Sequence, residues 1–212
     1  MEEVVHKIYV RDLVEYVLRH GDIISMFMGS GRALAGTRAH QKIQKSRPEE
    51  YRAEVTINAA YIIDGITIQL SGRIDGVWPL EYQTWIEEIK STTESISNID
   101  EDNHPLHWAQ AKIYACLYAQ QEHLESIGVL LTYYQLDTQE QLSLRKEFTR
   151  EELECFLKDV LEQYAGWAKT IQYWQSLRND SIQQLTFPFS GYPLSLPAKS
   201  KPTQPPLPYP VS

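Results

Sequence analysis

The alternation of apolar and polar residues is most regular between positions 66 and 78. Its apolar members share one face of an extended segment: Ile66, Ile68, Leu70 and Ile74. Residues two apart in a strand point to the same side, so this pattern predicts a half-buried strand. Asp64-Gly65 predicts a hairpin turn that joins it to a β-rich segment at 52–62. Further strands are predicted at 84–91, 126–136 and 141–148.

Apolar residues at helical spacing predict helices around these strands. The first covers 10–19, and Gly21 is its stop. The glycines in residues 29–36 predict a loop that leads into a second helix, which includes His40 and ends near Pro48. A polar loop at 92–105 precedes a third helix at 105–121. Thr149 and Glu152 match a capping box, which opens a long helix whose apolar stripe, from Leu153 through Trp167 to Trp174, we expect in the core.

The order of these elements predicts an α/β fold with a mixed central sheet of about five strands flanked by helices. The helix at 105–121 is the expected crossover between the third and fourth strands. Composition changes near residue 186, and eight of the 11 prolines fall between Pro188 and Pro210. The sequence therefore predicts one domain at 1–185 and a proline-rich, disordered tail at 186–212.

The formal net charge is −8, which argues against a passive nucleic-acid coat protein, because such proteins rely on cationic contacts with phosphate. One basic strip stands against this balance: Arg32, Arg38, Lys42, Lys45, Arg47 and Arg52. On charge alone it is a solvated helix face. The charged N-terminus resembles no secretory signal and no apolar run approaches the ~18 residues that span a bilayer, so we expect a cytoplasmic protein with no membrane partner.

Candidate chemistry gathers around the second and third predicted strands. Asp75 lies on the polar face of one strand, and Glu88 and Lys90 share a face of the next, with Ile89 between them directed to the core. If the strands pair as a hairpin, Asp75 and Glu88 converge. Two close carboxylates need a cation, and oxygen-rich sites suit Mg²⁺ or Mn²⁺. A neighbouring lysine can help a metal-bound water attack phosphorus, so these parts predict phosphodiester hydrolysis.

Two further residues complete the constellation. Gln110 and Tyr114 are four apart on the third helix, so they share a face and can brace the site or contact a phosphate. Gly72 and Gly76, beside Asp75, would let backbone or substrate approach closely. Taken singly, each motif has a structural explanation: a turn, a surface ion pair, a solvated helix face or a structural His40. Their order on these element types favours the functional explanation.

The residues Gly72-Arg73-Ile74-Asp75-Gly76, Glu87-Glu88-Ile89-Lys90 and Gln110-Ala111-Lys112-Ile113-Tyr114 resemble the PD-(D/E)XK nuclease superfamily, and its RecB-like branch in particular. The resemblance implies a restriction-endonuclease-like fold. It also implies that His40, Asp75, Glu88 and the Ile89 carbonyl hold the metal, while Lys90, Gln110 and Tyr114 support catalysis. Relatives with an iron–sulfur cluster carry four cysteines, whereas this chain has two, so no cluster is expected.

Residues 104–119 and 185–192 are similar to the nuclease domain fused to bacterial DinG/Rad3-type DNA helicases. No ATP-binding loop of the P-loop type occurs in the sequence, so no ATP is expected as a cofactor. The resemblance implies a metal-dependent DNA nuclease, more an exonuclease than an endonuclease, in repair or recombination, with DNA and a helicase as partners. Arg32, Arg38 and Lys42 become candidates for the DNA backbone. The alternative is a non-catalytic DNA-binding or docking module; cleavage of RNA also stays open.

Overall fold

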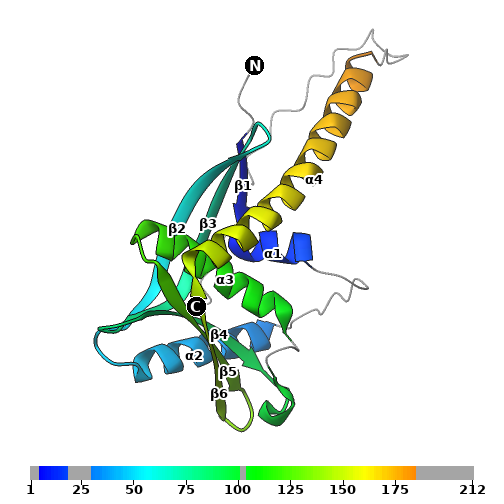
Figure 1. Cartoon of the computed structure of the whole chain (residues 1–212). Coiled ribbons are helices and arrows are strands. Elements are labelled where there is room, and N and C mark those ends of the chain that lie inside the picture. Colours follow the sequence, from blue (N-terminus) through cyan, green and yellow to red (C-terminus); the bar gives the residue numbers. More distant parts are fainter. Residues whose placement is uncertain (1–4, 19–29, 101–103, 185–212) are drawn as a thin grey trace, which may run out of the picture. The chain divides into compact units, whose positions relative to one another are not determined.

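A computed structural model describes residues 5–18, 30–100 and 104–184, although side chains 30–33, 172, 183 and 184 lie outside this description. Its centre is a six-stranded mixed sheet (Figure 1). The strands are β1 (Val5–Tyr9), β2 (Arg52–Ile63), β3 (Ile66–Pro79), β4 (Thr84–Thr92), β5 (Ser126–Gln135) and β6 (Gln141–Thr149). The helices are α1 (Val10–Leu18), α2 (Ser30–Ser46), α3 (Pro105–Gln121) and α4 (Arg150–Gln184), with a 3₁₀ turn at Ile96–Asn98.

Strand β3 organises the sheet because it has three partners. One edge pairs with β2 in a long antiparallel hairpin whose turn, Asp64-Gly65, has positive φ at both residues, as a two-residue hairpin turn requires. The other edge pairs first with β1, in parallel, up to Ser71, and then with β4, antiparallel, from Gly76. Between these two partners, residues 72–75 lack a strand neighbour on that edge. The sheet therefore divides beside Asp75.

The helices cover opposite faces of the sheet. Helices α1, α3 and the first part of α4 share one large apolar cluster with the sheet, which includes Leu13, Ile113 and Leu157. Helix α2 lies on the other face, where Ile43 packs with Ile89 and Tyr134 in a small separate cluster. Strands β4 and β5 are parallel, and α3 connects them. Residues of β4 therefore alternate between α2 and α3.

The sequence prediction of an α/β fold with a mixed, helix-flanked sheet is confirmed, but the strand count is six rather than about five. The missed strand, β1, is only five residues long, alternates between half-buried and exposed positions and runs directly into α1. Helix α2 begins at Ser30, so the loop expected over residues 29–36 is wrong where Gly31 and Gly36 are helical. Gly36 lets the helix approach β4, because a Cβ there would stand 3.0 Å from Ser91 Oγ.

The capping box at the start of α4 is confirmed: the Glu152 amide donates to Thr149 Oγ1 at 3.2 Å, and the Thr149 amide donates to Glu152 Oε2 at 2.8 Å. The expected apolar stripe is wrong at its far end, because Trp167 is 36% exposed and Trp174 is 62% exposed. The chain divides into two compact units after Gln172, and the first contains the whole sheet. The proline-rich tail and residues 185–192 lie outside the described residues.

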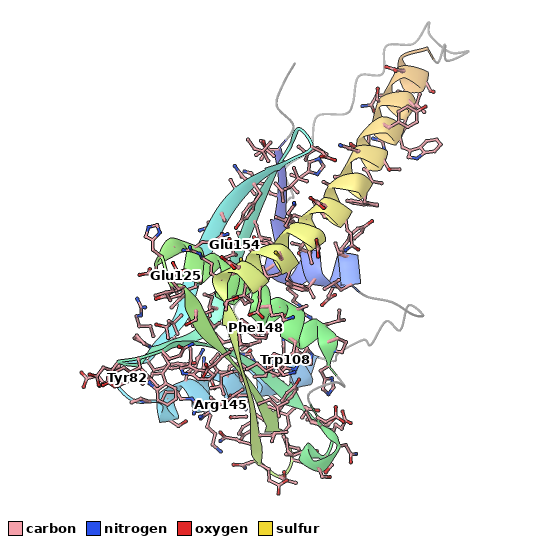
Figure 2. All side chains as sticks on the ribbon, viewed as in Figure 1. Tyr82, Trp108, Glu125, Arg145, Phe148 and Glu154 are labelled. Carbon is pink, nitrogen blue, oxygen red and sulfur yellow. The ribbon has the colours of Figure 1, made fainter. Side chains whose placement is uncertain are left out.

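Side chains at the β3–β4 turn and on α3 show how strongly burial varies across the first unit (Figure 2). Tyr82 is 90% exposed at that turn, whereas Trp108 on α3 is 6% exposed and has Lys146 Nζ 4.7 Å from its ring centroid. Among the described residues, no helix has the length and apolar character needed to cross a membrane.

Candidate metal centre

Asp75 occupies the point where β4 begins to separate from β3. The last regular pair of the two strands is Gly76 with Glu87, which places Asp75 next to Glu88. Beyond that pair, the Asp75 side chain replaces a backbone partner: the Ile89 amide donates to Asp75 Oδ2 at 2.8 Å. The other oxygen, Oδ1, lies 3.4 Å from His40 Nδ1 on α2. Asp75 thus links both strands with the helix.

Glu88 and Lys90 lie on the α3 face of β4, as their spacing of two requires. Lys90 Nζ is 2.8 Å from Glu88 Oε1 and donates to Gln110 Oε1 on α3 at 3.0 Å. Glu88 is 3% exposed, and its second oxygen, Oε2, is buried with no hydrogen-bond partner among the described residues. An unpaired oxygen on a buried carboxylate is costly, and a bound ion, a water or a catalytic role would account for it.

Tyr114 closes the α3 side of this cluster by packing on a glycine. A Cβ at Gly72 would stand 2.9 Å from the Tyr114 hydroxyl oxygen, so only glycine leaves room for the ring. Burial and the charge of Glu88 raise the pKa of Tyr114 to about 12, while hydrogen bonds from the Arg73 backbone and the Gln110 side chain oppose this shift. The phenol therefore stays protonated at neutral pH and faces the carboxylates as a neutral polar group.

The two glycines beside Asp75 were expected to admit backbone or substrate, and the structure shows a different use. A tyrosine ring fills each space: Tyr114 lies against Gly72, and Tyr51 lies so close to Gly76 that any Cβ would overlap its ring. The sequence did not reveal these contacts, because each ring comes from an element distant along the chain.

Burial and nearby charges shift the pKa values of Glu88 and His40. Burial raises the pKa of Glu88 to about 7; Lys90 opposes this rise and the charge of Asp75 reinforces it. Burial lowers the pKa of His40, but its hydrogen bond and charge interaction with Asp75 outweigh that effect, so the net shift is upward. Both shifts have the sign expected where excess negative charge gathers without a cation.

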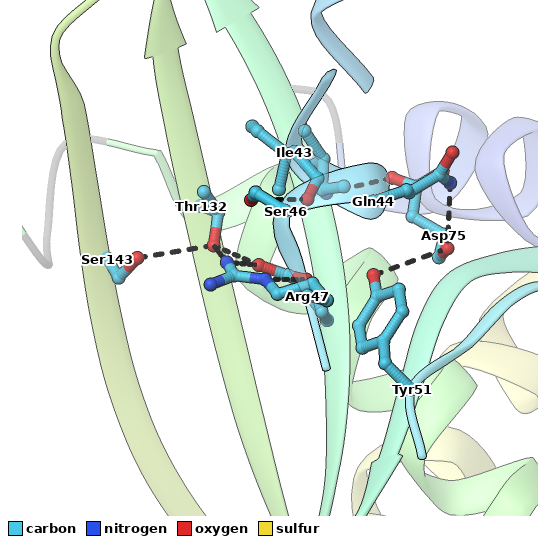
Figure 3. Close-up of polar contacts among 10 residues, drawn as sticks. Ile43, Gln44, Ser46, Arg47, Tyr51, Asp75, Thr132 and Ser143 are labelled. Atoms are coloured by element: carbon cyan, nitrogen blue, oxygen red, sulfur yellow. Dashed lines mark hydrogen bonds and ion pairs between the residues drawn. The ribbon is translucent and has the colours of Figure 1, made fainter. Parts of the chain in front are cut away.

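Helix α2 and the segment that follows it supply side chains that the sequence did not assign to the site. Gln44 Nε2 donates to the backbone oxygen of Asp75 at 2.9 Å, and the Tyr51 hydroxyl approaches the same oxygen at 3.5 Å (Figure 3). Gln44 follows His40 by four residues, so both lie on one face of the helix. That spacing was the available signal, and it would have identified Gln44 once His40 was chosen.

The basic strip does not act as one surface. Arg38 is exposed on α2, while Lys42 donates to Tyr134 Oη at 3.0 Å and Gln139 Oε1 at 2.6 Å. Arg47 is 18% exposed and forms an ion pair with Glu87, and Arg52 donates to the Tyr118 hydroxyl. The side chain of Arg32 lies outside the described residues. The interpretation of the strip as a solvated face is therefore wrong at Arg47, whose charge serves the interior.

The donor set fits a hard divalent cation. In the described part of the chain, no group of three or more His, Cys, Asp or Glu side chains is placed so that it could hold a metal ion. However, Asp75 and His40 are in contact, and the unpaired Glu88 oxygen adds a second carboxylate. The two carboxylates are the oxygen ligands that Mg²⁺ and Mn²⁺ prefer, and the imidazole adds a nitrogen donor. A cation here would satisfy that oxygen and reduce the repulsion that raises the pKa of Glu88.

Comparison with known proteins assigns the family. The family model described as PD-(D/E)XK nuclease superfamily matches residues 15–184, so the chain belongs to this superfamily. The crystal structure of SSO0001 is similar, with 17% sequence identity and a TM-score of 0.45 over 74% of this chain and 75% of that chain. No protein with curated annotation matches at a significant level. The superfamily of nucleases agrees with the motifs that carry Asp75, Glu88 and Lys90.

Proposed function

We propose that this protein is a metal-dependent deoxyribonuclease that hydrolyses phosphodiester bonds. The observation that carries the proposal is the unpaired, buried oxygen of Glu88 beside the contact of Asp75 with His40. Membership of the nuclease superfamily supports the same reaction class. Mg²⁺ or Mn²⁺ would be held by Asp75, Glu88, His40 and the Ile89 carbonyl, and when bound would supply Lewis acidity and lower the pKa of a water.

The chain's own residues would divide the remaining work. Lys90 would orient the attacking water and stabilise negative charge on the phosphate, because its ammonium group lies between Glu88 and Gln110. Gln110 would hold Lys90 in that position. Tyr114 would donate a hydrogen bond to the strand being cut, since its phenol stays protonated at neutral pH.

The proposal also covers the branch of the superfamily, the DNA substrate and the partner protein. We infer an exonuclease of the RecB-like branch that acts on DNA ends or single strands in repair or recombination, in the cytoplasm and beside a helicase. The order of the motifs supports the branch, and the similarity of residues 104–119 to helicase-fused nuclease domains supports the partner. Arg32, Arg38 and Lys42 would contact the DNA backbone. Of these, Arg38 has the strongest support, because it is exposed on the helix that carries His40.

The experiment is degradation of end-labelled single-stranded and duplex DNA with Mg²⁺ or Mn²⁺. Wild type is compared with Lys90→Ala and with Lys158→Ala, a control that removes an exposed lysine from α4. We expect metal-dependent cleavage in wild type and in the control, and a loss of roughly a hundred- to a thousand-fold in Lys90→Ala, the contribution of one well-placed electrostatic group. An end-labelled RNA in the same series tests the choice of sugar.

The net charge of −8 favours one competing function, a docking module that does not cleave. Such a module would bind DNA weakly and with strong salt dependence. If wild type and Lys90→Ala were equally inert while both bound DNA, the nuclease proposal would fail and the docking module would replace it.

A further inference from the structure

Glu87 is the most deeply buried carboxylate of β4, and no step of the proposed reaction uses it. It is 1% exposed and lies on the α2 face, opposite to Glu88. Arg47 binds it with two nitrogens: Nε donates to Oε2 at 3.1 Å, and Nη2 donates to Oε1. The Thr132 hydroxyl on β5 donates to the same carboxylate (Figure 3). Both oxygens of Glu87 are therefore satisfied within the protein.

This ion pair belongs to a continuous row of contacts between α2 and the β3–β4 hairpin. Three members of the row, His40, Ile43 and Gln44, lie on α2 at helical spacings of three and four, and the fourth, Arg47, comes directly after the helix ends at Ser46. Three of these contacts reach the residues around the metal centre: His40 meets the Asp75 side chain, Gln44 meets the Asp75 backbone, and Ile43 packs on Ile89. The fourth joins the end of the helix to the residue immediately before Glu88.

We propose that Arg47 and Glu87 are positioning residues for the metal centre. Their two-point ion pair fixes the place of α2 along β4, so that His40 reaches Asp75, and it fixes the backbone of β4 next to Glu88. The inference rests on the proposed function, since it assigns the pair a role in building the site for the cation.

Stability alone is a weak reason to keep such a pair. Burying two charges loses about as much hydration energy as their attraction returns, and apolar side chains of similar volume often serve equally well. The planar guanidinium adds direction, because it accepts a carboxylate in one geometry. The apolar contact of Ile43 with Ile89 has no such preference and tolerates sliding. A displacement of about 1 Å at a catalytic centre can reduce its rate roughly a hundred-fold.

The test separates position from stability with the double variant Arg47→Met/Glu87→Met, in which apolar side chains replace both charges. A matched control, Lys158→Met/Glu162→Met, removes an exposed ion pair on α4. Three quantities are measured: the urea unfolding midpoint, Mn²⁺ affinity by calorimetry without DNA, and the rate of DNA cleavage. We expect the double variant to retain its midpoint while Mn²⁺ affinity and cleavage each fall at least ten-fold, and the control to change none of the three.

Arg47→Lys provides a second measurement if the double variant does not fold. It keeps the charge but removes the two-point geometry, so we expect Mn²⁺ affinity to fall about three-fold or more in a folded protein. If the double variant bound Mn²⁺ and cleaved DNA as well as wild type, the positioning role would be overturned, but the proposed nuclease function would stand. If only Arg47→Lys folds, the same result in that variant would overturn the positioning role. If wild type itself bound no Mn²⁺, the proposed function would fail and the positioning role would fall with it.

Discussion

Two neighbouring glutamates on one strand have opposite environments. On the α2 face, Glu87 accepts hydrogen bonds from Arg47 and Thr132, which satisfy both of its oxygens. On the α3 face, Glu88 has one ion pair, with Lys90, and one buried oxygen without a partner among the described residues. Both side chains are almost completely buried. Glu87 is therefore satisfied within the protein, whereas Glu88 keeps one oxygen for which we propose the metal as partner.

The largest effect on stability should come from removing the charge of Glu87. Glu87→Gln keeps the volume but leaves Arg47 without a counter-charge. Breaking a buried pair costs about 3–5 kcal/mol, and we expect about 3 kcal/mol because Arg47 retains 18% exposure. Urea unfolding of wild type and variant measures it. A loss below about 1 kcal/mol would mean that the Glu87 carboxylate does not hold Arg47 as their contacts indicate.

Removing the charge of Glu88 should instead increase the stability of the metal-free protein. Without metal, the folded-state pKa of Glu88, about 7, lies above the unfolded value, so Glu88 destabilises the protein progressively as pH rises from about 4.5 to above 7. Glu88→Gln mimics the protonated acid and should stabilise the metal-free protein by about 2 kcal/mol at pH 8 and by almost nothing at pH 4. Unfolding in EDTA at both pH values measures this gain. A destabilised variant at pH 8 would contradict the account.

His107, which lies on α3, should make the stability of the protein depend on pH in the acid range. Burial, the charge of Lys90 and the neighbouring His104 lower the pKa of His107 to about 3. Unfolding lets His107 take up a proton below pH 6.5, so it contributes stability that is lost as pH falls from about 6.5 towards 3. Between pH 7 and pH 5, the free energy of unfolding of His107→Gln should therefore fall by roughly 1 kcal/mol less than that of wild type. Exposed His123, changed to Asn, is the control; equal acid losses in wild type and His107→Gln would contradict this prediction.

The smallest effect is expected at Arg38, on the exposed face of α2. Arg38 is exposed on α2, whose inner face carries His40 and Gln44. Arg38→Ala should weaken DNA binding in EDTA by two- to five-fold and reduce the salt dependence by about one phosphate contact. Its unfolding midpoint should not change. Fluorescence anisotropy with a labelled oligonucleotide at several salt concentrations measures both quantities, and unchanged binding would remove Arg38 from the proposed DNA surface.

Much of the fold followed from local patterns in the sequence. The alternation along β3 and the Asp64-Gly65 turn predicted the long hairpin because one face of that strand is buried and the turn chemistry is specific. Strand β1 could not be predicted in this way, because it pairs in parallel with residues about sixty positions away and buries little. Its contribution depends on tertiary pairing rather than on its own pattern.

Some features of the site could likewise be predicted from the sequence, and others could not. Hairpin geometry predicted that Asp75 and Glu88 would lie side by side, and strand alternation placed Lys90 on the face of Glu88. The spacing rule could not predict that a backbone amide would bind Asp75, or that tyrosine rings would fill the spaces at two glycines. These contacts depend on how separate elements approach one another. The partner of Glu87 was also missed, because Arg47 was grouped with exposed cations.

The most direct test of the central claim is the effect of Mn²⁺ on the melting temperature of wild type, Glu88→Gln and the exposed-carboxylate control Asp64→Asn. A ligand at about a hundred times its dissociation constant stabilises the native state by about 2.7 kcal/mol, which is several degrees for a chain of this size. We expect this rise in wild type and in Asp64→Asn, and none in Glu88→Gln. An equal rise in all three proteins would contradict the claim that Glu88 holds the metal.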